Sequence, residues 1–287
     1  MLLQISVTII SKEQSYVKMN SILSLLENIG VVVGPIVGGY FVFRSNYFGV
    51  FAIVILSFFV VLVLSVVIKL RGFIKELPSS ASEKQNDKIL KEKIENTENF
   101  ENSKHTLRKI FYPIVIFGFS ISIINVIQIS FVVSHYNMNE LGFGLTESAW
   151  GFGMAIGALL LILFNKILRN QTIFALSFLI IGISVLTLVI SNNFGLAILM
   201  FFLIGVGNIV VSIISTTMIQ KLSSSAYLGK NLGIKSMLFQ GASIVSMVVT
   251  GVFETTISPA LLYISAGTIF ILTSMLVFSS FKSEIEL

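Results

Sequence analysis

With 55% hydrophobic and only 11% charged residues in a chain of 287, and a mean hydropathy of +0.94, the sequence is too apolar for a water-soluble globular domain. The absence of cysteine excludes disulfides, thiolate metal sites and cysteine nucleophiles. The net charge of +5 does not require a nucleic-acid partner, because lysine and arginine mark the cytoplasmic loops of polytopic membrane proteins. We therefore expect a membrane protein that binds no nucleic acid.

The apolar residues are grouped in windows long enough to cross a bilayer, which requires roughly 20 residues per helix. Charged residues and turn residues separate these windows. The eight windows are residues 20–43, 47–69, 110–134, 146–165, 171–190, 194–218, 232–253 and 259–281. The sequence thus predicts an all-α membrane protein, a polytopic bundle of about eight transmembrane helices.

The chain begins with "MLLQISVTII", which is apolar but too short to span a bilayer. It lacks the basic start and the small-residue cleavage site of a signal peptide. We interpret residues 1–19 as a cytoplasmic or interfacial stub.

The first window contains "NIGVVVGPIVGGYF", in which glycines recur every fourth residue around a proline. Small residues at this spacing form a groove along one face of a membrane helix, and proline bends the helix by removing a backbone donor. The motif consists of Gly30, Gly34, Pro35, Gly38 and Gly39. Glu27, about two turns into this window, is the candidate titratable residue, with reach to the membrane interface as the simpler explanation.

After the second window, the segment "KELPSSASEKQNDKILKEKIENTENFENSKH" contains few apolar residues and many charged ones. Such a composition favours a solvated spacer over a folded or regulatory module. We therefore interpret residues 20–70 as two transmembrane helices, 71–109 as a charged cytoplasmic linker, 110–281 as a six-helix C-terminal half and 282–287 as a cytoplasmic tail.

The basic residues predict the orientation of this arrangement. If the N-terminus is cytoplasmic, the cytoplasmic connections contain nearly all of them, including Lys221, Lys230 and Lys235, and Arg44 alone lies outside. The positive-inside rule then places both termini and the linker in the cytoplasm. We expect an integral protein of the plasma membrane.

Two later windows contain polar residues spaced three or four apart, so that each set lies on one helix face. Such a stripe either contacts a substrate or forms hydrogen bonds between helices, and the spacing leaves both open. The candidate cavity residues are Ser122, Asn125 and Gln128 in one window and Asn208, Ser212 and Ser215 in another. Between them, Gly153 and Gly157 form a candidate helix-packing groove.

No motif for catalysis, nucleotide binding or metal binding is present, so we expect no enzyme activity and no cofactor. His105 and His135 have no metal-ligand companion at helical spacing. Glu147 and Glu254 fall at the expected outer ends of helices, where we expect them to be solvated.

The glycine-proline motif resembles motif C of the major facilitator superfamily, G-x3-G-P-x2-G-G, found in helix five of proton-coupled exporters. The preceding "NSILSLLENIG" is similar to the start of that helix in the macrolide-efflux-like branch. The resemblance implies that residues 20–43 are helix five, residues 47–69 are helix six and the last six windows are helices seven to twelve. Helices one to four are then missing, and the two remaining cavity helices, seven and ten, are those that contain the asparagines.

The resemblance further implies a partial facilitator fold that exports an amphiphilic, drug-like molecule by alternating access, in exchange for protons. Its partners would be the lipid bilayer, the substrate, protons and a separate four-helix N-terminal piece. The alternative is a non-transporting fragment that acts only by assembling with other membrane proteins.

Overall fold

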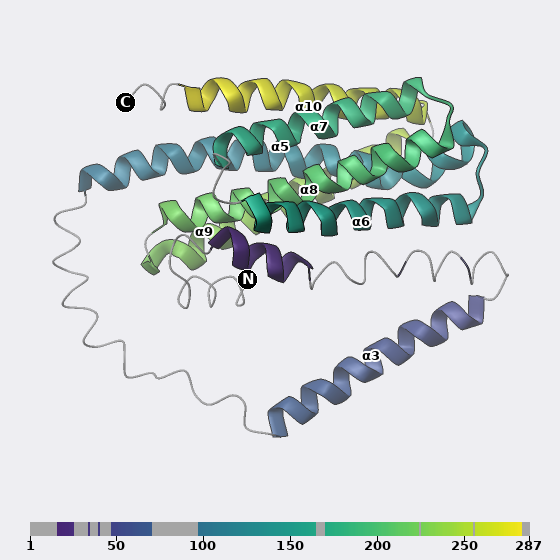
Figure 1. The fold of residues 1–287 in the computed structure, drawn as a ribbon, viewed down its shortest axis with the longest axis horizontal. Coiled ribbons are helices and arrows are strands. Elements are labelled where there is room, and N and C mark those ends of the chain that lie inside the picture. The colour runs from purple at the N-terminus through teal and green to yellow at the C-terminus, as the bar shows by residue number, and fades with distance from the viewer. Residues whose placement is uncertain are drawn as a thin grey trace. The chain divides into compact units, whose positions relative to one another are not determined.

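A computed structural model describes residues 16–25, 34, 40, 47–70, 97–164, 170–223, 225–254 and 256–282. Regular structure in these ranges is α-helical, without strands. Residues 16–25 form a short helical segment. The longer helices are α3 (Tyr47–Leu70), α5 (Thr97–Tyr136), α6 (Glu140–Phe164), α7 (Asn170–Ile190), α8 (Phe194–Leu222), α9 (Ser225–Phe253) and α10 (Pro259–Lys282) (Figure 1).

From residue 47 onward, each expected window coincides with one helix, but three helices begin earlier than expected. α5 begins at Thr97, inside the expected linker, and α6 and α9 begin at Glu140 and Ser225. Hydropathy detects only the part of a helix that is apolar enough to lie in the hydrocarbon core. The helix itself can continue into polar sequence until a residue interrupts its backbone hydrogen bonds. Most of the window 20–43 lies outside the described residues.

Local sequence explains two of the sharpest helix boundaries. Asn137, just after α5, has a φ of 53°, a left-handed conformation that asparagine tolerates and that ends a helix. Asn193 precedes α8, and its side chain accepts a hydrogen bond of 3.2 Å from the backbone N–H of Leu196. This contact caps the helix by satisfying one of its unpaired N–H groups.

The chain separates into two compact units, one of residues 1–39 and 106–287 and the other of residues 40–105. The second unit contains α3, which exposes large apolar side chains, including Phe48, Phe51 and Phe58. Such exposure suits a lipid environment and not water.

In the first unit, helices α5 to α10 pack as a bundle (Figure 1). α8 packs against α6, α7 and α9, and α7 packs against α10. Phe117 of α5 joins several of these helices, because its ring lies 5.8 Å from Phe178 of α7, 5.8 Å from Phe239 of α9 and 6.1 Å from Phe270 of α10. The core of the unit is therefore formed around α5 and α8.

Glycine allows the backbones of α6 and α8 to approach closely. A Cβ atom at Gly153 would lie 2.0 Å from the carbonyl oxygen of Phe202, and one at Gly205 would lie 2.1 Å from that of Trp150. Lipid provides no hydrophobic drive between helices, so close contact of this kind stabilises the pair.

Six helical segments of the described part are long and apolar enough to cross a membrane. They are Thr106–Tyr136, Leu141–Leu163, Gln171–Ile190, Phe194–Leu222, Tyr227–Phe253 and Pro259–Ser280. The protein is therefore an all-α polytopic membrane protein, as its composition predicts.

Candidate functional site

The polar stripe of α5 divides between helix packing and an accessible surface. Gln128 is fully buried, and its Nε2 donates a hydrogen bond of 3.2 Å to Thr146 Oγ1 of α6. Ser122 is also buried, whereas Asn125 is exposed. Of this stripe, Asn125 is the residue that a bound molecule could reach.

The stripe of α8 divides in the same way. Ser215 is buried, and its hydroxyl donates to the Ser212 carbonyl at 3.0 Å. Asn208 is half-buried, and its Nδ2 lies 3.8 Å from Met154 Sδ of α6. Ser212 is exposed. Among the described residues, the bond between Ser215 and Ser212 is the one hydrogen bond that joins two of the six candidate cavity residues. No hydrogen bond of the described part therefore links the stripe of α5 to the stripe of α8.

Glu147 lies in the membrane span of α6 and not at a solvated helix end, so the expectation for this residue was wrong. Because α6 begins at Glu140, Glu147 lies about 10 Å along the helix, and its side chain is half-buried. The Gln128 side chain lies within reach of its carboxylate. The Gln128 Oε1 atom is buried and has no partner among the described residues.

Two tyrosines complete the surroundings of Glu147. Tyr263 of α10 is fully buried, its hydroxyl has no hydrogen-bond partner in the described part of the chain, and Phe131 stacks on it at 4.1 Å. Tyr136 donates a hydrogen bond of 2.7 Å to the Leu188 carbonyl. Tyr263 lies in the neighbourhood of both Glu147 and Tyr136. A polar cluster with one carboxyl group thus lies among α5, α6 and α10. Glu254, by contrast, follows the end of α9 and accepts a hydrogen bond from Ser130.

Lys235 also lies within a membrane span, which corrects its assignment to a cytoplasmic loop. α9 begins at Ser225, and Lys235 lies well inside the candidate span Tyr227–Phe253. Its ammonium group donates to the Ser212 carbonyl at 3.0 Å and to Thr216 Oγ1. The run "LSSS" at residues 222–225 could have placed Lys235 correctly, because these serines indicate a helix boundary ten residues before it.

The short helical segment 16–25 packs against the C-terminal end of α8. Asn20 Nδ2 donates hydrogen bonds to Thr217 Oγ1 at 3.2 Å and to Gln220 Oε1 at 2.7 Å, and all three side chains are buried. Sequence reasoning missed this contact, because no local pattern joins residues 197 or more positions apart.

We expect Asn20→Ala to lower the free energy of unfolding by about 1 to 3 kcal/mol, because it leaves buried polar atoms of α8 without this partner. The measurement is thermal denaturation of the purified protein in detergent. Asn192→Ala, at an exposed loop position, is the matched control and should leave the transition temperature unchanged. Equal transitions for both variants would contradict the prediction.

Most of the glycine-proline motif lies outside the described residues, as does Glu27. Among its members Gly34 is described, in a helical conformation and exposed, and a Cβ there would meet no described atom within 4 Å. Gly153 and Gly157 of α6 contact α8, where a Cβ at Gly157 would lie 2.6 Å from the Ile209 side chain.

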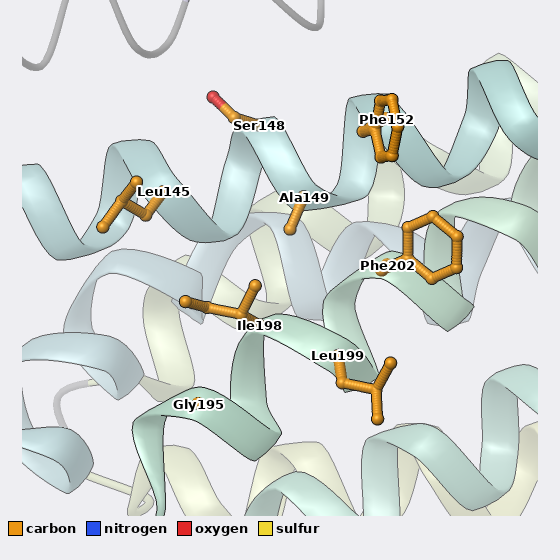
Figure 2. Close-up of a pocket in the computed structure, with 8 residues that line it drawn as sticks. All are labelled: Leu145, Ser148, Ala149, Phe152, Gly195, Ile198, Leu199 and Phe202. Atoms are coloured by element: carbon orange, nitrogen blue, oxygen red, sulfur yellow. The ribbon is translucent and has the colours of Figure 1, made fainter.

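Beside this contact, α6 and α8 line an open apolar groove of about 580 Å³ (Figure 2). Phe152 of α6 and Phe202 of α8 lie at one end of it, with ring centroids 6.0 Å apart. Its other lining residues are Leu145, Ser148, Ala149, Gly195, Ile198 and Leu199. The groove offers almost no polar partner, so it cannot by itself select a ligand.

No group of three potential metal-ligating side chains occurs among the described residues. The model of the family described as Major Facilitator Superfamily matches residues 2–247, which is most of the chain. No curated protein matches the chain.

Proposed function

The chain belongs to the major facilitator superfamily and is a membrane transporter of that type, and from this premise we propose that it exports an amphiphilic, drug-like molecule by alternating access coupled to protons. Motif C, which resembles that of proton-coupled exporters, supports export. The distribution of basic residues supports a plasma-membrane protein with both termini in the cytoplasm.

The observation on which the substrate site depends is the exposure of Asn125 and Ser212. Each lies in the middle of a polar stripe on an otherwise apolar span, and the described residues leave both uncovered. Within a membrane span, contact between an exposed polar group and lipid is energetically unfavourable. Contact between that group and water or a polar ligand is favourable. Together with the half-buried Asn208 these residues are the proposed cavity lining, and the buried members Ser122, Gln128 and Ser215 are proposed to lie behind it. Motif C and the Gly153–Gly157 groove are proposed to hold the helices around it.

Proton exchange requires a group that gains and loses a proton within the transport path. In the described part of the chain, Glu147 is the carboxyl residue within a candidate membrane span, and its neighbour Gln128 can hydrogen-bond either protonation state. We therefore propose Glu147 as the coupling group.

We expect cells that express the chain to accumulate less of a fluorescent amphiphile than cells with an empty vector. Asn125→Ala should reduce this difference about fivefold or more, because it removes an exposed amide that a bound molecule could reach. Asn192→Ala, an exposed amide in a loop, should retain full export. Accumulation equal to the empty-vector control across a panel of amphiphiles would overturn the proposed function.

A further inference from the structure

Lys235 places an ionisable amino group well inside the candidate membrane span of α9. It lies eight residues after Tyr227, the first residue of the candidate span, or roughly 12 Å along the helix. Lysines near helix ends usually extend to the membrane interface. The ammonium group of Lys235 instead bonds the carbonyl of Ser212, which lies about 15 Å before the end of α8.

The surroundings of Lys235 contain more hydrogen-bond donors than acceptors. The Ser212 carbonyl accepts from Lys235 Nζ at 3.0 Å, from Ser215 Oγ at 3.0 Å and from Thr216 Oγ1 at 2.8 Å. A carbonyl oxygen has two lone pairs, whereas a lysine ammonium has three N–H donors. Two of these donors point to Ser212 and Thr216, and the third has no acceptor among the described residues.

In the described part of the chain no carboxylate forms an ion pair with Lys235, whose printed partners are both uncharged. An unpaired charge inside a membrane span is costly and often marks a binding site. The group that would complete the surroundings of Lys235 is therefore a hydrogen-bond acceptor that carries a negative charge.

The cluster opens toward an accessible surface. Ser212 is exposed, and on α9 the side chains of Ser236 and Gln240, next to and near Lys235, are exposed as well. Ser212 belongs to the stripe proposed to line the substrate cavity. A molecule in that cavity could therefore reach the ammonium group.

We propose that Lys235, together with Ser212 and Thr216, binds the negatively charged head group of the transported amphiphile, a carboxylate, sulfonate or phosphate ester. This inference rests on the proposed export function and specifies its substrate class. The oxyanion would accept the third N–H of the ammonium group and the hydroxyl of Ser212, while its apolar part lies along the apolar faces of the helices.

Binding of a matched pair of probes tests the proposal. The full chain is placed in phosphatidylcholine nanodiscs, and the binding of pyrenebutyrate is compared with that of its uncharged methyl ester, after subtraction of binding to empty nanodiscs. We expect the wild-type protein to bind the anion at least about tenfold more tightly than the ester. Lys235→Gln should abolish this preference.

Two variants separate the charge of Lys235 from its place in the fold. Lys235→Arg keeps the charge and should keep the preference for the anion. Lys230→Gln removes an exposed lysine of the same helix and should leave the preference unchanged, whereas an equal loss of preference in this variant would assign it to net charge and contradict the proposal.

Three further results would overturn the proposal. One is equal binding of the anion and the ester by the wild-type protein, which leaves the export function untouched. Another is loss of pyrenebutyrate binding when phosphatidylglycerol replaces part of the lipid, which assigns the site to a lipid head group. The third is loss of the preference for the anion in Lys235→Arg, which keeps the charge. Export that fails for every probe would instead contradict the proposed function itself.

Discussion

Replacing Gly153 with leucine is expected to separate α6 from α8 and to lower the free energy of unfolding by about 3 kcal/mol or more. Even a methyl group at this position would lie 2.0 Å from the Phe202 carbonyl oxygen and 3.1 Å from the Val206 nitrogen. Both atoms belong to the backbone of α8, so no side-chain rotation can make room. The measurement is thermal unfolding and the monodisperse fraction of the purified protein in detergent.

Gly241→Leu is the matched control, because a Cβ at Gly241 of α9 would meet no described atom within 4 Å. This variant also replaces a helical glycine with leucine, which has the higher helix propensity. We expect its stability to be equal to that of the wild type or slightly higher. If both variants unfold at the wild-type temperature, the close contact between α6 and α8 does not exist in the protein.

Glu147→Gln is expected to reduce substrate accumulation driven by a pH gradient by about tenfold or more. Exchange of substrate at equal pH should continue. The Gln128 amide lies near the carboxyl group of Glu147, and an amide offers a donor to an ionised carboxylate and an acceptor to a protonated one. Glutamine preserves size and hydrogen bonding but cannot gain or lose the proton. Proteoliposomes with an imposed pH gradient provide the measurement.

Glu254→Gln is the matched control for this experiment. Glu254 follows the end of α9, bonded to Ser130, and is not within a candidate span. Its replacement should leave gradient-driven accumulation within twofold of the wild-type value. Gradient-driven accumulation that persists in Glu147→Gln would assign the coupling to another residue.

The positions of the helices could be predicted from the sequence, because the bilayer imposes a length of apolar chain that hydropathy measures directly. The windows 171–190 and 259–281 agree with α7 and α10 to within a residue. The start of α5 could not be predicted in this way, since the polar residues from Thr97 onward are compatible with a helix that continues beyond the apolar span.

The candidate site could be predicted only in part. Helical spacing placed Asn125 and Ser212 on polar stripes, and both side chains are exposed. The same spacing could not distinguish them from Gln128, which bonds Thr146 of α6. Periodicity reports the face of one helix, and the neighbour that covers that face depends on how the helices pack.

The sequence by itself determined that this protein is an α-helical membrane protein, because hydrocarbon satisfies no backbone hydrogen bond and long apolar segments must therefore form helices. It also predicted Gly153 and Gly157 as a packing groove, whereas their counterpart Gly205 of α8 was not predicted. Only the tertiary structure decided that Glu147 and Lys235 lie inside spans, beside Gln128 of α5 and Ser212 of α8. The reason is physical: the environment of a charge depends on groups that folding brings together from distant parts of the chain.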